Sequence, residues 1–366
     1  MSAPEPVRRS GFLRDGGWFL VAGLALATLA AGWQVVSVLG HRHSAAVGDG
    51  RTVASYRFDL SRMTVPIDRI VASGAVKDGV PALTAPASWT LADLDADAQK
   101  RRGKLLVSGD RVVGLSLGGQ HRAYPLRFLV WHEVVNDTLG GVPIAVTYSP
   151  LSDSVAVFRR TVRGEVLELG VSGLLYDSSL LMYDRRPGAA GESLWSHLLA
   201  RAVSGPEAAA GAVLATVPCS VTTWSDWRAL RPETTLLAPD PRTSEEYKRE
   251  PYGSYFGSDI LRFPVAPLPP LGGPPLKTPV VAVRTAAGFV AITFPALAAL
   301  VDAAGEWRAS VDGSRLKFHY RSHPDAVSVA RESGEAAADF YSFYFAWYAT
   351  HRDDTTWLVD PEQTGT

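Results

Sequence analysis

The sequence has a single cysteine, Cys219, among 366 residues. One thiol can form neither an intrachain disulfide nor a cysteine-based metal cage, so no cross-link of either kind holds this fold together. An excess of charge is lacking as well, because 36 basic and 37 acidic residues give a net charge of -1. Since no long basic run is present either, we expect no nucleic-acid partner.

The signatures of common enzyme classes are also lacking. No phosphate loop, dinucleotide fingerprint or pair of catalytic carboxylates stands out. The stretch TYSPLSDSVAVF, residues 147–158, contains Ser149 and Ser152, but neither Gly-x-Ser-x-Gly nor Ser-x-x-Lys surrounds them. Pro150 indicates a loop that enters the next strand, where Ser152 and Asp153 most often bond to the local backbone. These serines are therefore weaker candidates for a nucleophile than for a turn or a pocket wall.

The stretch WHEVVND, residues 131–137, begins like the zinc-protease motif His-Glu-x-x-His. Asn136 stands where the second histidine is required, and asparagine is a poor zinc ligand. We expect no bound metal and no other cofactor. The pattern predicts a short amphipathic helix that ends in a turn at Asn136 and Asp137. His132 and Glu133 then face either the core or a pocket.

Tyrosine and aspartate are concentrated in SGLLYDSSLLMYDRR, residues 172–186. Tyr176, Asp177 and Asp184 are candidates to line a polar cleft for a small ligand. They are equally compatible with outward positions of a strand and its turns.

Residues 16–40 carry no charged side chain. About 20 apolar residues in a helix span a bilayer core, so this run predicts a transmembrane anchor. Arg8, Arg9 and Arg14 precede the run, which slightly favours a cytoplasmic N-terminus. A cleaved signal peptide and a buried soluble helix are the alternatives.

Beyond Lys104 the chain has short alternating apolar runs separated by turn residues, which indicates strands. A hairpin is predicted around Gly109 and Asp110. Helical patches are few, and they read PLRFLVWHEVV, TTWSDWRAL and FPALAALVDAAG. The expected fold class is α+β and β-rich, with an N-terminal transmembrane helix followed by an extracytoplasmic domain.

Two parts of this domain are similar to each other. YSPLSDSVAV, residues 148–157, aligns without gaps on YRSHPDAVSV, residues 320–329, and similar segments flank both. Three matching pieces in one order predict two unequal pseudo-repeats. The expected organisation is a cytoplasmic tail (1–15), the anchor (16–40), a tether (41–60), a main domain with the first repeat (61–265), a Pro-rich linker (266–279) and a shorter second repeat (280–366).

Six blocks in order resemble a known family. They include VPIDRIVASGAVKDGVPAL, HRAYPLRFLVWHEVVNDTLGGVPIAVTYSPLSDSVAVF, VSGLLYDSSLLMYDR, ESLWSHL, TTWSDWRALRPETTLL and EPYGSYFGSDILRFPV. Together they are similar to the prokaryotic domain-of-unknown-function family numbered 3179. The resemblance implies an exported or membrane-anchored protein, and it brings no established activity.

The resemblance also shows a departure. Relatives usually carry Cys-Pro-Leu-Cys where this chain has Ser149 to Ser152, and a Cys-x-x-Cys pair can bind a soft metal or cycle as a disulfide. Serine hydroxyls do neither, so the resemblance implies that any thiol chemistry is lost here. Trp131, His132 and Glu133 are retained, as are Asn136 and Asp137.

We therefore expect a membrane-anchored, extracytoplasmic binding or accessory module, with the main domain on the periplasmic side of the cell membrane. Its partners would be the membrane, through residues 16–40, and other subunits of a membrane complex. The alternative is a periplasmic enzyme that acts on a small polar substrate through His132, Glu133 and Asp153. The candidate pocket residues are His132, Glu133, Asn136, Asp137, Ser149, Ser152, Asp153, Tyr176, Asp177 and Asp184.

Overall fold

The computed structural model describes residues 47–101, 104–186 and 191–361. One compact unit begins at Gly48. Within these described ranges no helix is both long and apolar enough to cross a membrane. The expected anchor, residues 16–40, lies outside them.

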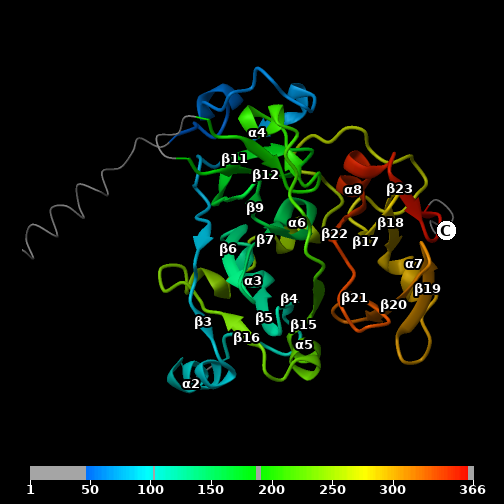
Figure 1. Ribbon diagram of the computed structural model, residues 1–366. Coiled ribbons are helices and arrows are strands. Elements are labelled where there is room, and N and C mark those ends of the chain that lie inside the picture. The colour runs from blue at the N-terminus through cyan, green and yellow to red at the C-terminus, as the bar shows by residue number, and fades with distance from the viewer. Residues whose placement is uncertain (1–46, 102–103, 187–190, 362–366) are drawn as a thin grey trace, which may run out of the picture. The chain divides into compact units, whose positions relative to one another are not determined.

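Three β-sheets make up most of the unit, and the β-rich α+β class is confirmed (Figure 1). Sheet 1 has the order β19-β20-β21-β15-β4-β5-β16-β3, sheet 2 the order β2-β6-β7-β8-β22-β17-β18-β23, and sheet 3 the order β1-β11-β12-β13-β14. The strands of sheet 1 are β3 (Ser88–Trp89), β4 (Arg111–Leu117), β5 (Gln120–Pro125), β15 (Ser220–Thr223), β16 (Thr235–Leu237), β19 (Glu306–Val311), β20 (Ser314–Arg321) and β21 (Ala326–Arg331). Those of sheet 2 are β2 (Leu83–Thr84), β6 (Val134–Leu139), β7 (Val142–Ser149), β8 (Ser154–Arg159), β17 (Pro279–Thr285), β18 (Gly288–Thr293), β22 (Phe340–Phe343) and β23 (Thr355–Trp357). Those of sheet 3 are β1 (Ile70–Ala72), β11 (Leu169–Tyr176), β12 (Ser179–Asp184), β13 (Leu194–Ser196) and β14 (Arg201–Ala202), and β9 (Thr161–Val162) pairs with β10 (Glu165–Val166).

The helices are short and occupy the ends and edges of the sheets. They are α2 (Leu91–Arg101), α3 (Leu126–Leu129), α4 (Gly205–Ala209), α5 (Trp224–Leu230), α6 (Gly253–Phe256), α7 (Phe294–Ala298) and α8 (Tyr344–His351), with 3-10 turns η2 (Val53–Tyr56), η3 (Ile67–Arg69), η4 (Pro150–Ser152) and η6 (Glu246–Lys248). The Thr223 hydroxyl caps α5 by accepting a hydrogen bond from the Asp226 amide at 3.2 Å. Trp227 of α5 then packs on Gly114 of β4, where a Cβ atom would lie 2.2 Å from the indole. Only glycine allows this close approach.

The hydrophobic core lies in layers between the sheets. Alternate residues of β4 in sheet 1 and of β7 in sheet 2, such as Val113 and Val146, share one core. The opposite face of sheet 2 packs against sheet 3, where Ala145 meets residues such as Met182. Beyond sheet 3, Tyr56 is only 1% exposed although it lies in the stretch expected to be a tether.

Two local predictions were wrong. The β4–β5 hairpin turns at Gly118 and Gly119, not at Gly109 and Asp110, because both central residues of this turn have positive φ (56° and 74°). The helix predicted over residues 131–137 is absent, since α3 ends at Leu129 and β6 begins at Val134. In Val-Val-Asn-Asp-Thr-Leu, β-branched residues and pairing with β7 favour the strand.

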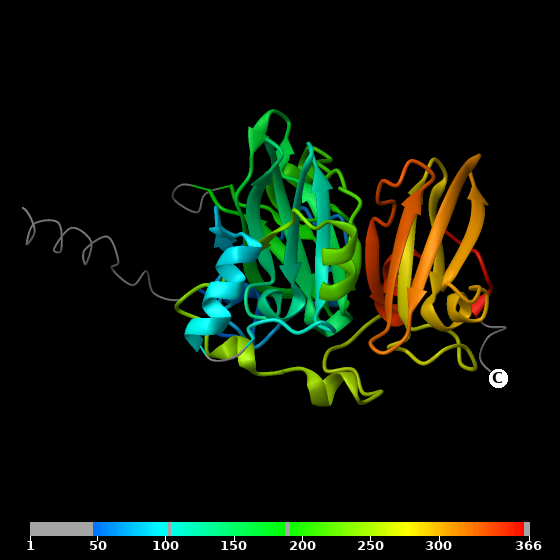
Figure 2. The same cartoon turned by 90° about the horizontal axis from the view of Figure 1, so that it is seen from below.

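Strands from two parts of the chain pair in the same way. In sheet 1, β4 is antiparallel to both β15 and β5, and β16 is parallel to β5. In sheet 2, β17 is antiparallel to both β22 and β18, and β23 is parallel to β18. The two parts join where β8 pairs with β22 and β15 with β21, so strands of residues 279–357 lie beside those of residues 111–237 (Figures 1 and 2).

Candidate functional site

A cavity of about 280 Å³ lies beside sheet 3, and Glu133 is the predicted site residue that lines it. Its wall also includes the loop after β1, the middle of η4 and the segment that follows α6. The lining residues are Ser73, Ala75, Val80, Glu133, Leu151, Val171, Gly173, Leu174, Leu175, Leu180, Tyr252, Arg262 and Phe263. Apolar side chains therefore surround three ionisable ones, an arrangement typical of small-molecule sites.

Glu133 has an unusual backbone conformation. The chain turns sharply between α3 and β6, and Glu133 adopts φ +56°, in the left-handed region that L-residues rarely occupy. The turn is held by hydrogen bonds from its amide to the Leu129 carbonyl (2.7 Å) and from the Tyr148 amide to its carbonyl (2.8 Å). Such strain costs on the order of 1–3 kcal/mol and is concentrated at functional sites.

The Glu133 side chain is half-buried. Burial raises its pKa from the ordinary 4.5 to about 8, so the protonated form predominates at neutral pH. No described residue hydrogen-bonds to this carboxyl, which therefore offers a free hydrogen-bond donor to the cavity.

Tyr252 and Arg262 complete the polar part of the cavity. Burial, and after it the charge of Glu133, raises the pKa of Tyr252 to about 12. The Arg262 guanidinium lies over two aromatic rings, 4.9 Å from the centroid of Tyr255 and 5.3 Å from that of Tyr252. Neither the Tyr252 hydroxyl nor the guanidinium hydrogen-bonds to a residue that the structure describes.

The segment that carries these two residues is fixed at several points. The Tyr255 hydroxyl donates to the Leu151 carbonyl at 2.7 Å, and the Ser178 hydroxyl donates to the Phe263 carbonyl at 3.1 Å. The buried ammonium of Lys277 donates to the carbonyls of Tyr255 (2.5 Å), Ser258 and Ile260 (3.0 Å). These contacts position Arg262 beside the cavity before any ligand binds.

The serine loop lies directly behind this wall, since Leu151 belongs to the cavity. Ser149 is 2% exposed and its hydroxyl accepts a hydrogen bond from the Leu180 amide at 3.1 Å. Ser152 is fully buried, and its hydroxyl lies 2.7 Å from that of Ser154. Both hydroxyls therefore serve local structure.

Asp153 is also engaged by its neighbours. Its carboxylate accepts hydrogen bonds from Arg111 (2.9 Å) and from the Tyr148 hydroxyl (2.8 Å), and its φ of +41° ends η4. His197 is fully buried and contacts the Thr147 hydroxyl through Nδ1 at 2.8 Å. Burial lowers the pKa of His197 to about 3, so the ring is neutral.

His132 points away from the cavity although it is next to Glu133. Its Nδ1 donates to the Pro81 carbonyl at 2.8 Å, and its Nε2 accepts from the Tyr247 hydroxyl at 2.6 Å. With both nitrogens satisfied and burial lowering its pKa, His132 is a neutral structural residue.

Asn136 and Asp137 tie strands together. The Asn136 amide donates to the Leu169 carbonyl (2.8 Å) and accepts from the Leu169 amide (2.9 Å). Asp137 accepts from Arg122 (2.6 Å) and from the Tyr124 hydroxyl (2.8 Å). Neither side chain lines the cavity.

The Tyr176 to Asp184 segment is spread along the β11–β12 hairpin. Asp177 lies at the turn, where it pairs with Arg69, whose guanidinium also lies 4.8 Å from the Tyr176 ring centroid. Asp184 lies at the other end of the hairpin and accepts from the Ser193 amide and from Arg186. These residues do not form one cleft.

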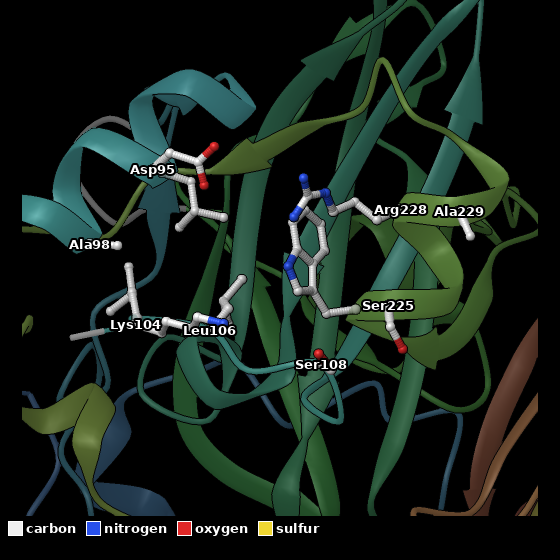
Figure 3. A pocket seen from close by; sticks show the side chains of 11 residues that line it. Asp95, Ala98, Lys104, Leu106, Ser108, Ser225, Arg228 and Ala229 are labelled. Atoms are coloured by element: carbon white, nitrogen blue, oxygen red, sulfur yellow. The ribbon is translucent and has the colours of Figure 1, made fainter.

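A second cavity, of about 460 Å³, lies between α2 and α5, and none of the predicted site residues lines it (Figure 3). Asp95 of α2 and Arg228 of α5 extend into it from opposite sides (Figure 3). The Arg228 guanidinium lies 6.0 Å from the Trp224 ring centroid.

Among the described residues no group of three or more His, Cys, Asp or Glu side chains is arranged to bind a metal ion. Cys219 is fully buried, and burial raises the pKa of its thiol. The thiol is therefore inert in this position.

One family matches the sequence from residue 77 to residue 365, which is most of the chain. The chain belongs to the DUF3179 family. The description of DUF3179 is a protein of unknown function, so membership assigns no activity. No curated protein and no solved structure matches the chain.

Sequence reasoning missed Tyr252 and Arg262 of this DUF3179 chain. Both lie in EPYGSYFGSDILRFPV, which was noticed only as a block of the resemblance. The available signal was the group of aromatic residues around Tyr252 and Tyr255 followed closely by an arginine, a combination that allows guanidinium–ring stacking.

Proposed function

We propose that this protein is a membrane-anchored, extracytoplasmic binding module that holds a small ligand in the Glu133 cavity. The observation that carries the proposal is an apolar cavity whose three ionisable side chains, Glu133, Tyr252 and Arg262, have no hydrogen-bond partner among the described residues. Glu133 and Tyr252 are half-buried, and polar groups withdrawn from water are normally paired, so their free hydroxyl groups favour a ligand beside the exposed Arg262.

The location is proposed on the sequence. Residues 16–40 are uncharged and long enough to span a bilayer, and the arginines before them favour a cytoplasmic N-terminus. The domain would then lie on the periplasmic side, where it is available as an accessory subunit of a membrane complex.

We also propose that the domain contains two pseudo-repeats of one unit. The Tyr148 hydroxyl bonds to Asp153 at 2.8 Å, and the Tyr320 hydroxyl bonds to Asp325 at 2.9 Å. Likewise, the indole N–H of Trp227 donates to Thr234, and that of Trp347 donates to Thr355. Together with the matching strand orders, these paired contacts support a duplication in which the first copy gained residues 161–219.

That insertion accounts for the difference between the copies. Val134 and Ala145 lie under sheet 3, whereas the corresponding strands β19 and β20 carry Glu306 and Lys317, which form an ion pair at 3.0 Å. An apolar face needs a cover and a charged face does not.

Native mass spectrometry of the full-length protein released from lipid nanodiscs tests the proposed binding. Wild-type protein should retain a small organic molecule, either from the cell or after soaking with a panel of small organic acids, alcohols and amines. Ser73→Trp, which fills the cavity, should lose it, whereas the exposed control Ser333→Trp should not.

Val80→Phe is a second variant that narrows the cavity from another position of the same loop, in case Ser73→Trp folds poorly. Retention that is equal in all variants, or no retention by the wild type of any molecule in the panel, would refute the binding proposal.

A second candidate function is an enzyme in which Glu133 acts as the general acid or base. A carboxyl with a pKa of about 8 is suited to proton transfer near neutral pH. We favour the binding module over the enzyme. His132 and Asp153, the expected catalytic partners of Glu133, already form hydrogen bonds with other residues. Turnover of a cavity ligand that Glu133→Gln abolishes would reverse this choice.

A further inference from the structure

We infer that the ligand of the Glu133 cavity is a small organic anion, with a carboxylate on a compact apolar body. This inference rests on the proposed function, and it names the class of ligand that the charges and shape of the cavity select.

The charge at the cavity is positive. The guanidinium of Arg262 is exposed and forms no ion pair with a described residue. Lys277 is a second cation close to Arg262. Burial lowers the pKa of Lys277, the charge of Asp259 raises it, and the positive charge of Arg262 lowers it further. A guanidinium fork binds carboxylates through two hydrogen bonds, so an anionic head group is favoured and an ammonium group is repelled.

The charged groups of the neighbouring loop are already paired, and the charge of Asp259 acts on Lys277. In the loop after β1, Lys77 pairs with Glu192 and Asp78 with Arg185. Glu133 is thus the acidic residue that lines the cavity. Its protonated carboxyl donates a hydrogen bond to an oxygen of the ligand, while its ionised form would repel an anion.

The rest of the wall matches an apolar body. Leu151, Val171, Leu175 and Leu180 are each less than 9% exposed and bring aliphatic surface to the cavity. A volume of about 280 Å³ accommodates a single ring or a short branched chain, which suits a monocarboxylate of modest size. Burial of such a body supplies affinity, and the head group supplies selectivity.

Isothermal titration calorimetry with three compounds of one shape tests the ligand class. The probes are 3-phenylpropanoate, its amide and 3-phenylpropylamine, each added to full-length protein in nanodiscs, with empty nanodiscs as the blank. We expect the acid to bind at least tenfold more tightly than the amide, and the amide more tightly than the amine. Palmitate is a fourth probe, and weaker binding than 3-phenylpropanoate is expected, because a long acyl chain exceeds the cavity.

Substitution of Arg262, together with a matched control, measures the contribution of the guanidinium. Arg262→Gln should weaken the acid at least tenfold and leave the amide within about twofold. The control Arg228→Gln, an exposed arginine that also faces an aromatic ring, should change neither.

The pH profile provides an independent signature. Affinity for the acid should be constant between about pH 6, where the carboxyl of the probe is ionised, and about pH 8, and then fall by up to tenfold per pH unit, because deprotonated Glu133 repels the ligand. The Tyr252 hydroxyl stays protonated in this range, because burial raises its pKa to about 12. Glu133→Gln should remove the pH dependence.

The outcomes distinguish the two levels of the proposal. If the acid and the amide bind equally and Arg262→Gln has no effect, the anion class is wrong although a binding cavity remains. Tighter binding of palmitate than of 3-phenylpropanoate would overturn the size argument and point to lipid-derived acids. If none of the probes binds, or if Ser73→Trp does not weaken them, the cavity is not a binding site and both proposals fail.

Discussion

Replacing Asn136 with alanine should destabilise the protein more strongly than other changes on the same strand. Asn136 is fully buried in β6. Its side-chain amide donates to the carbonyl of Leu169 in β11 and accepts from the amide of the same residue, as the backbone of a neighbouring strand would. Leu169 lies opposite Asp184 of β12, and the adjacent hydrogen bond runs from the Arg185 amide to the Glu168 carbonyl, so the amide and carbonyl of Leu169 bond to Asn136.

The magnitude follows from what the substitution leaves behind. Leu169 is fully buried, and each of its two backbone groups would lose its partner at a cost of about 1–3 kcal/mol. We expect a total of about 3–5 kcal/mol for Asn136→Ala. For a domain of this size, that corresponds to a decrease in Tm of roughly 5–10 °C.

The assay is thermal denaturation of the full-length protein in nanodiscs, followed by intrinsic tryptophan fluorescence. Thr138→Ala is the matched control, because Thr138 lies two residues along β6 with its side chain exposed. The control should lose less than about 1 kcal/mol. A Tm for Asn136→Ala within 1 °C of the control would refute the assignment of Asn136 as the partner of β11.

Three further predictions concern other parts of the structure. Lys277→Met should lower stability by about 2–3 kcal/mol in the same assay, because three backbone carbonyls lose a charged donor. The control Lys248→Met, which breaks an exposed ion pair, should lower stability by under about 0.5 kcal/mol. Equal losses in the two variants would contradict the role of Lys277 as the donor to these carbonyls. Folding raises the pKa of Glu133 to about 8, so the folded chain holds a proton that the unfolded chain releases near pH 4.5, and this group's contribution to stability declines as pH rises between those values. Glu133→Gln should therefore be more stable than the wild type at pH 8, by about 4 kcal/mol at roughly 1.4 kcal/mol per pKa unit, and similar to it at pH 4.5; no gain at pH 8 would show that the carboxyl is hydrated. Elemental analysis of the dialysed full-length protein should find less than about 0.1 equivalent of zinc or copper, and a retained stoichiometric metal would contradict the expectation that the Ser149–Ser152 loop binds no metal.

Some of the fold could be predicted because its signals are local. Alternating β-branched residues predicted the strands after Lys104, and the predicted helical patch TTWSDWRAL contains α5, which Thr223 caps. The hairpin was misplaced because Gly109-Asp110 and Gly118-Gly119 are both turn signals, and only pairing of β4 with β5 decides between them. Similarly, Val134-Val135 suits a helix or a strand until β7 provides a partner.

The candidate site was predicted in part for a related reason. Glu133 and the Ser149–Asp153 loop come together because the Tyr148 amide bonds to the Glu133 carbonyl, and this contact joins residues 15 positions apart. Tyr252 and Arg262 line the same cavity although they lie more than 100 residues after Glu133 in the chain. No local sequence pattern predicts a contact at such a separation.

The sequence by itself determined the family, the β-rich class and the absence of a cysteine pair, because these depend on residue identity and short-range order. Only the tertiary structure decided which candidates share a cavity. His132 and Glu133 are adjacent in the chain, yet the left-handed conformation at Glu133 sends one side chain to Tyr247 and the other into the cavity. Burial there, and not the residue type, raises the pKa of Glu133 to about 8, because the charged form loses its hydration.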